Sequence, residues 1–452
     1  MLRNPIRYLS LLLVVIIATP ILGQESLEQA WEYAISASKK LEAEGYKINS
    51  AQATKDAASA ARMPQFAMES SYTTMSSSPK MKVDMTPAMQ GFAYAAAMSN
   101  LPELAGNILA LPTQMETPVS NQSFGTASVG VIVPIYTGGK ISSLESAGQS
   151  LTQAAIYSRT AETSNLKLEV AQAYLMVQRV EKLHQVAVAA KESLDGHLKD
   201  VQNLLEQGLV TKTALLSAQV AQAQAQQNVL NVEFGLKTAK AAYNRLLWRP
   251  LDSPVSLVEL PMPNDIQTVE TLMNMAVQIR PELSQLAAQS QALNSKADSI
   301  RAERRPQVAA GASFSYYEND HLSTNGYGQG TVGVVWSPID SVGRARERAT
   351  RNEAYAVCKM RDEVANAIRL QVQKAYNDNQ VARNRINIAQ LAVQQSEENL
   401  RLVKEQFKQG IATYTQVLDA QALWNQAHSN YCNSIYDALL ASYTLKHAVG
   451  NL

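Results

Sequence analysis

An internal duplication governs the architecture of this chain of 452 residues. Two halves carry the same motifs in the same order: 62–65 resembles 304–307, 129–131 resembles 332–334, and 207–219 resembles 409–421. The distance between matching motifs shrinks by about 40 residues after the first pair, which indicates one insertion in the first half. We therefore predict a first repeat at 24–248 with an inserted loop at 75–118, a linker at 249–267, and a second repeat at 268–452.

Each half contains a stretch suited to a very long helix. No proline occurs between residues 141 and 248, and apolar residues there are spaced alternately four and three apart, at Leu166, Val170, Ala173, Val177 and Val180. This spacing forms an apolar stripe along one side of a helix, which another helix must cover. A helix over 141–207 would be about 100 Å long. The pattern predicts an extended helical bundle.

Two glycines mark the ends of these long helices. Gly208 and Gly410 suit the position just after a helix, where the backbone turns left-handed at little cost to glycine. Thr211 and Thr413 follow at the N-cap position of a returning helix. Each half therefore reads as helix, strand, loop, strand, long helix, glycine turn and return helix.

Four segments alternate as β-strands do, at 65–73, 123–135, 307–317 and 326–339. In the second, Val129 and Val131 fall on one face, whereas Ser128 and Gly130 fall on the other. Strands of about ten residues with one apolar and one small polar face suit a bilayer-spanning barrel. A soluble sheet packed on one face fits the alternation equally well. Four strands cannot close, so a barrel would need several chains, and three copies would supply twelve strands.

The first 23 residues have the layout of a cleavable signal peptide. Arg3 and Arg7 precede a short apolar run from Leu9 to Ala18, and Gly23 lies near the predicted cleavage site. An uncleaved anchor is the alternative. Either form takes the protein out of the cytoplasm, which favours the membrane interpretation of the strands.

Charge and motif content exclude several functions. The net charge is only +1, so we expect no nucleic-acid partner. No phosphate loop, dinucleotide fingerprint or nucleophile elbow occurs in a suitable context, so we expect no enzyme, catalytic residue or cofactor. The histidines lack metal-ligand spacing, which predicts no metal site. Cys358 and Cys432 are both interpreted as buried apolar side chains.

The inserted loop is rich in methionine and has two interpretations. We expect a surface-exposed lid with short helices, since methionine in an Ala-rich segment usually serves as flexible packing. Thioethers also bind Cu(I), so copper binding is the alternative. The methionines concerned are Met75, Met81, Met85, Met89, Met98 and Met115.

With these paired motifs, the chain resembles the TolC-like family of outer-membrane efflux proteins, also called outer membrane factors. The resemblance spans about residues 25–452 and is most specific at 208–219 and 410–421. It implies a mainly α fold in which duplicated long-helix hairpins form a trimeric α-helical tunnel, with four strands per chain of a twelve-stranded barrel. It also implies a homotrimer in the outer membrane of a Gram-negative-type cell, extending into the periplasm. Outer-membrane lipid, a periplasmic adaptor (membrane fusion protein) and an inner-membrane transporter would be its partners.

The resemblance further implies where the channel narrows and where the adaptor docks. Family members narrow the periplasmic end with acidic side chains just after the turn, and here Asp419 and Gln416 occupy such positions. Three Asp419 carboxylates would form a ring, whereas the alternative is that Asp419 caps or pairs locally. The adaptor would contact the tip formed by Gly208, Thr211, Leu216, Gly410, Thr413 and Leu418.

The function predicted from these features is passive export. The chain would be the exit channel of a tripartite efflux or type I secretion system, driven by an inner-membrane partner. The rival interpretation is a periplasmic coiled-coil adaptor or structural protein without a pore. An adaptor usually has one hairpin between compact β domains, whereas this sequence predicts two hairpins and paired strands.

Overall fold

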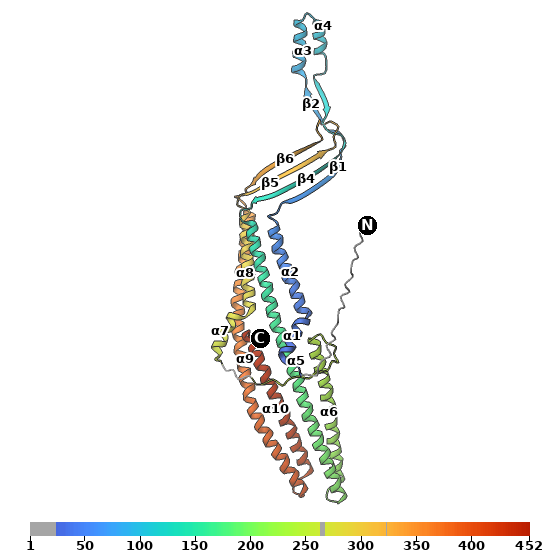
Figure 1. Ribbon diagram of the computed structural model, residues 1–452, viewed down its shortest axis with the longest axis vertical. Helices are drawn as coiled ribbons and strands as arrows, with labels where there is room; N and C mark the ends of the chain where they lie inside the picture. The colour runs from blue at the N-terminus through green and yellow to red at the C-terminus, as the bar shows by residue number, and fades with distance from the viewer. Residues whose placement is uncertain (1–23, 263–266, 322) are drawn as a thin grey trace, which may run out of the picture. The chain divides into compact units, whose positions relative to one another are not determined.

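The computed structural model describes residues 24–262, 267–321 and 323–452 (Figure 1). The predicted signal peptide lies outside the described residues, as does part of the predicted linker. In chain order the elements are α1 (Leu27–Ala37), α2 (Lys39–Ala60), β1 (Gln65–Thr74), β2 (Lys80–Asp84), α3 (Thr86–Met98), α4 (Pro102–Leu109), β3 (Gln114–Pro118), β4 (Ser123–Tyr136), α5 (Lys140–Glu206), α6 (Lys212–Leu246), α7 (Val269–Ile279), α8 (Pro281–Ala302), β5 (Gln307–Tyr317), β6 (Gly326–Val335), α9 (Ser341–Lys408) and α10 (Tyr414–Val449). In these ranges, none of the helices combines the length and the apolar character needed to cross a bilayer.

The chain divides into two compact units, and each draws on both halves of the duplication. The first holds the described residues up to 48, together with 154–287 and 358–452. The second holds 49–153 and 288–357. The first contains the returning hairpins and the second contains the strands.

Each half begins with two helices where the sequence analysis predicted one. The break between α1 and α2 falls at Ser38, and the break between α7 and α8 falls at Arg280. Both residues have an extended backbone, while their N–H groups still bond to Ala34 and Ala276 at 2.9 and 3.0 Å. In the second half, Pro281 favours the first position of a new helix because it has no N–H to donate.

Two equivalent cores hold the first unit together. In the first half, α1, α5 and α6 bury a cluster that includes the predicted stripe residues Leu166, Val170 and Val177. In the second half, α7, α9 and α10 bury a matching cluster around Val372 and Ala448. The apolar stripe is therefore covered by helices, as its spacing predicted.

The predicted strands are confirmed and form one antiparallel sheet in the order β1, β4, β5, β6. The first three agree with prediction to within a residue at each end. The last strand is shorter than predicted and ends at Val335, ahead of Pro338, which cannot donate a ladder hydrogen bond.

The register of this sheet places the apolar residues on one face. Val129 lies opposite both Met68 and Phe314, and directly paired residues point to the same side. Ser128 lies opposite Glu69 and Ser315, on the other face. Within the described residues, β1 and β6 each pair along one edge only, so the sheet ends in two open edges.

The inserted segment contains more structure than the predicted lid. The short helices expected there are confirmed as α3 and α4. The antiparallel pair β2 and β3 was not predicted, because each strand has only five residues and no clear alternation. The methionines of this segment are distributed over β2, β3, α3 and the adjoining turns.

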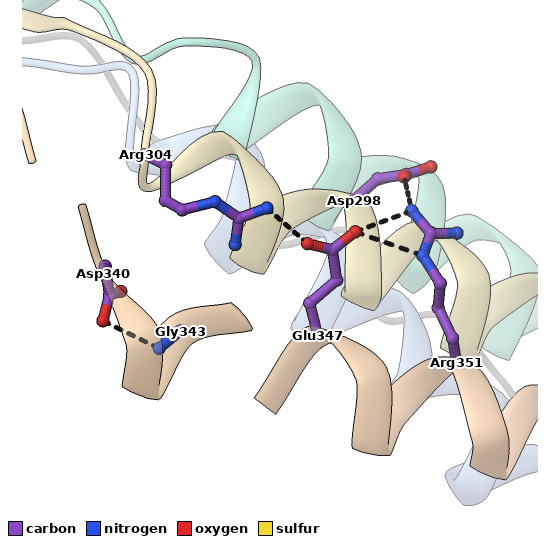
Figure 2. A network of polar contacts seen from close by, with 6 residues as sticks. All are labelled: Asp298, Arg304, Asp340, Gly343, Glu347 and Arg351. Carbon is purple, nitrogen blue, oxygen red and sulfur yellow. Dashed lines mark hydrogen bonds and ion pairs between the residues drawn. The ribbon is translucent and has the colours of Figure 1, made fainter. Parts of the chain in front are cut away.

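A network of charged residues joins α8 to α9 in the second unit. Figure 2 shows Glu347 between two guanidinium groups, since it accepts hydrogen bonds from Arg304 and from Arg351. Arg351 also bonds to Asp298 at 2.8 Å. Burial opposes ionisation of Glu347, but the two arginines outweigh it and lower the pKa of this carboxyl.

The first half repeats the central contact of this network. Arg62, before β1, pairs with Glu145 on α5, just as Arg304, before β5, pairs with Glu347 on α9. Counting only the strands of the four-stranded sheet, each half ties the residue that leads into its first strand to the helix that follows its second strand.

The two cysteines differ in environment. Cys432 is buried, as predicted, whereas Cys358 is exposed and its prediction was wrong. Ala354, one turn earlier on the same helix, is buried, and its carbonyl accepts a hydrogen bond from Ser290 on α8 at 3.0 Å.

Candidate functional site

The two hairpin tips have the same backbone geometry. Gly208 and Gly410 have φ angles of 72° and 76°, in the left-handed region that favours glycine. The N–H of Leu209 bonds to the Leu204 carbonyl at 2.9 Å, and the N–H of Ile411 bonds to the Gln406 carbonyl at 2.8 Å. The predicted turns are confirmed as left-handed helix ends.

Both return helices begin at the predicted threonines. The Thr211 hydroxyl accepts a hydrogen bond from the Ala214 N–H, and the Thr413 hydroxyl accepts one from the Gln416 N–H. In return, the Gln416 side-chain oxygen accepts a hydrogen bond from the Thr413 N–H at 2.7 Å, which completes a capping box. Gln416 thus has a local structural role, and its place in a pore constriction stays a prediction.

Apolar side chains are exposed around the tips. Leu216, one of the predicted adaptor contacts, is exposed, whereas Leu418 is half-buried. Leu209 and Ile411 are also exposed and were missed by the sequence analysis. The sequence could have identified them, because an apolar residue directly follows the turn glycine in both repeats.

Asp419 lies on the exposed side of α10, a little beyond the capping box. In the described part of the chain its carboxylate has neither a hydrogen-bond nor an ion-pair partner, so the alternative of local pairing gains no support. It borders a groove of about 370 Å³ between α5, α6 and α10, lined by Leu194, Ala221, Asn228, Leu418, Gln421 and Asn425.

A small core joins the two hairpins just above the tips. Each of the four long helices contributes one buried side chain: Val201 from α5, Ala218 from α6, Phe407 from α9 and Val417 from α10. Any movement that separates the hairpins at the tip must therefore expose this apolar cluster to water.

His197 lies beside this core in an aromatic cluster. Its ring stacks on Tyr414 with centroids 5.3 Å apart and meets the edge of Phe407. The residue is 5% exposed, and among the described residues its Nε2 has no hydrogen-bond partner. Burial, with help from the Lys404 charge and against that of Asp200, lowers the pKa of His197 to about 4.

Polar contacts also connect the hairpins near the tips. Lys404 on α9 donates to Ser193 on α5 at 2.7 Å, and Ser193 donates to Gln421 on α10 at 2.7 Å. Burial lowers the pKa of Lys404. Farther from the tip, Arg179 on α5 bonds to Asn433 on α10 at 2.8 Å. These ties and the apolar cluster hold the tip in one arrangement.

Replacing His197 by phenylalanine is expected to reduce the acid sensitivity of the fold. Because the pKa of His197 is lowered to about 4 from an ordinary 6.5, the unfolded chain binds the proton first. Folding stability therefore falls as pH drops from about 6.5 towards 4, and His197→Phe removes that loss. Urea unfolding at several pH values measures it. His184→Phe is the control, and an identical pH slope in wild type and His197→Phe would contradict the prediction.

The comparison with protein families gives one match that covers most of the chain. Residues 32–247 and 272–451 match the family model described as "Outer membrane efflux protein". A comparison with curated protein sequences finds no match.

Solved structures of outer-membrane channels have a similar fold. VceC from Vibrio cholerae is 19% identical, with 94% of this chain and 96% of that chain covered and a TM-score of 0.72. The outer-membrane channel OprN is 14% identical, with 94% and 90% covered and a TM-score of 0.73. MtrE from Neisseria gonorrhoeae, solved in an open state, is 14% identical, with 94% and 88% covered and a TM-score of 0.69.

Proposed function

The chain belongs to the outer membrane efflux protein family, and from this premise we propose that it is the passive exit channel of a tripartite efflux or type I secretion system. Its site of action is the outer membrane, with the helices extending into the periplasm. The observation that carries the proposal is a sheet that cannot be complete in one copy and leads directly into long helical hairpins.

The open edges of the sheet support a homotrimer. Unpaired N–H and C=O groups are too costly to leave in hydrocarbon, so β1 of one copy would pair with β6 of the next. Three copies give twelve strands, enough for a water-filled lumen, whereas the eight strands of two copies would be filled by side chains. The face bearing Val129 and Phe314 would meet outer-membrane lipid, and the face bearing Ser128 would line the lumen.

The tips support docking of a periplasmic adaptor, which would link the channel to an inner-membrane transporter. Leu209, Leu216 and Ile411 present apolar surface at both turns, beyond the core that joins the hairpins. Exposed apolar side chains on a rigid helical tip suit a partner that offers helices of its own. Thr211 and Thr413 hold the turns that present these side chains.

Asp419→Asn is expected to reduce the cation preference of the open channel. Three free Asp419 carboxylates around one lumen would attract cations and repel anions, and the substitution removes all three charges while keeping the side-chain shape. The reversal potential of single channels in a salt gradient measures this. Asp56→Asn, on α2, is the control, and an unchanged cation preference in Asp419→Asn would reject the ring.

Reconstitution tests the proposed function itself. Purified protein in detergent should have the mass of three copies by light scattering and should produce ion conductance in planar bilayers. A folded monomer without conductance would overturn the channel and favour an adaptor or structural role.

A further inference from the structure

The hairpin formed by α3 and α4 exposes an unusual amount of apolar surface. In the described structure, α3 has no charged residue and α4 has one, Glu103. Large apolar side chains project from both helices and the adjoining turns, at Phe92, Tyr94, Met98, Leu101, Leu104, Leu109 and Leu111, and each is exposed. Exposed apolar surface of this extent usually marks an interface.

This hairpin has too little core to be stable in water without further contacts. Among its described side chains only Ala93 and Ala96, both on α3, are buried. The helices have 13 and 8 residues, and isolated helices of fewer than about 12 to 15 residues are marginal in water. Apolar contacts with another surface would stabilise it.

The base of the hairpin is fixed to the main sheet. The Met75 N–H bonds to the Gln122 carbonyl at 2.8 Å, where β1 ends and β4 begins, and the strands β2 and β3 that lead to the hairpin pair with each other. The Asn319 side chain, which follows β5, donates to the Val119 carbonyl at 3.0 Å. These bonds lie at the end of the sheet opposite to α2 and α5, so the hairpin continues the strands away from the helices.

We propose that the α3–α4 hairpins of three copies pack against one another and form an apolar cap over the outer mouth of the channel. This inference rests on the proposed trimer. Each copy contributes one such hairpin from the same strand ends, and a closed three-fold arrangement brings equivalent surfaces around one axis. The partner of the apolar surface is therefore the same surface of the other two copies.

The charge distribution favours self-association over a lipid surface. No lysine or arginine occurs between Lys82 and Lys140, and the charged residues in that interval, Asp84, Glu103 and Glu116, are all acidic. Helices that lie on anionic lipid usually carry lysine and arginine beside their apolar face. An almost uncharged surface associates with a copy of itself without charge repulsion.

The cap would act as a hydrophobic gate. Apolar side chains around a narrow opening exclude water and ions until they separate, so the outer mouth would be closed at rest. Closure by the cap would not involve the tip core formed by Val201, Ala218, Phe407 and Val417, because the cap and that core share no residue.

Cysteine crosslinking in the full-length protein tests the contact. In a background with Cys358→Ser and Cys432→Ser, Phe92→Cys should yield covalent dimers with a short bismaleimide, because each copy then has one thiol and each thiol bonds to one maleimide. The control is Tyr46→Cys on α2, because Phe92 and Tyr46 are equally exposed, at 67% and 68%. Crosslinks from Phe92→Cys, together with none from Tyr46→Cys, support the cap. Their absence from Phe92→Cys in a protein that is trimeric by light scattering overturns it.

Removal of the hairpin tests the gate. Residues 85–113 are replaced by Asn-Gly, a two-residue turn suited to joining Asp84 and Gln114, which are already paired. The shortened protein should remain trimeric and show a severalfold higher mean conductance in planar bilayers. A trimer with unchanged conductance overturns the gate. Binding of wild-type proteoliposomes, but not shortened ones, to added phosphatidylethanolamine–phosphatidylglycerol vesicles would also overturn it, in favour of a lipid partner. A full-length protein that is not trimeric refutes the proposed channel instead.

Discussion

Val129→Lys is expected to abolish assembly of the protein in the outer membrane, whereas Ser128→Lys should be tolerated. The two residues are neighbours on β4 but point to opposite faces, since Val129 pairs with Met68 and Ser128 pairs with Glu69. If the face bearing Val129 meets lipid, a lysine near the bilayer midplane costs about 2–4 kcal/mol in each copy. At Ser128 the new ammonium group would face water and lie opposite the Glu69 carboxylate.

The measurement is the amount of trimer in the outer-membrane fraction, resolved by electrophoresis without heating. The paired design separates the effect of the face from the effect of adding a lysine to this strand. Equal amounts of trimer from both variants would contradict a lipid-facing apolar surface and restore the alternative of a sheet packed in water.

Arg280→Met is expected to lower the free energy of unfolding by about 3 kcal/mol, the lower end for buried pairs, because it breaks a partly buried ion pair and leaves its partners without donors. Arg280 is 7% exposed and occupies the break between α7 and α8. Its guanidinium donates to the Glu282 carboxylate at 2.8 and 2.9 Å and to the Ala448 carbonyl, near the end of α10, at 2.9 Å.

The substitution would remove hydrogen bonds from both partners of Arg280, the Glu282 carboxylate and the end of α10. Burial opposes ionisation of Glu282, and the bonds from Arg280 outweigh it and lower the pKa of the carboxyl. Without Arg280 the carboxylate stays partly buried and unpaired, and the last turn of α10 loses a donor and a favourable positive charge. Urea unfolding in detergent measures the change. Arg301→Met, at an exposed position of α8, is the control, and equal midpoints for the two variants would contradict the prediction.

Features of the site that depend on a few adjacent residues were predictable. The turns at Gly208 and Gly410 and the caps at Thr211 and Thr413 follow from local backbone chemistry, and they are confirmed. The capping role of Gln416 was also predictable, because glutamine at the third helical position after a threonine is the sequence pattern of a capping box.

Features that depend on packing between distant segments were not predictable. Lys404, Ser193 and Gln421 form one chain of hydrogen bonds at the tip, yet they come from three different helices. His197 shows no special pattern in the sequence, and its lowered pKa arises only from the aromatic rings and neighbouring helices that bury it.

The sequence by itself determined the duplication, the long helices, the positions of the turns and the alternation of the strands. Periodicity and turn chemistry act over a few residues, so these features are visible in a single chain. Only the tertiary structure decided the strand order, the pairing of Val129 with Phe314 and the contact of Arg304 with Glu347. Such contacts join residues far apart in sequence, and their stability comes from simultaneous burial and hydrogen bonding that no local pattern specifies.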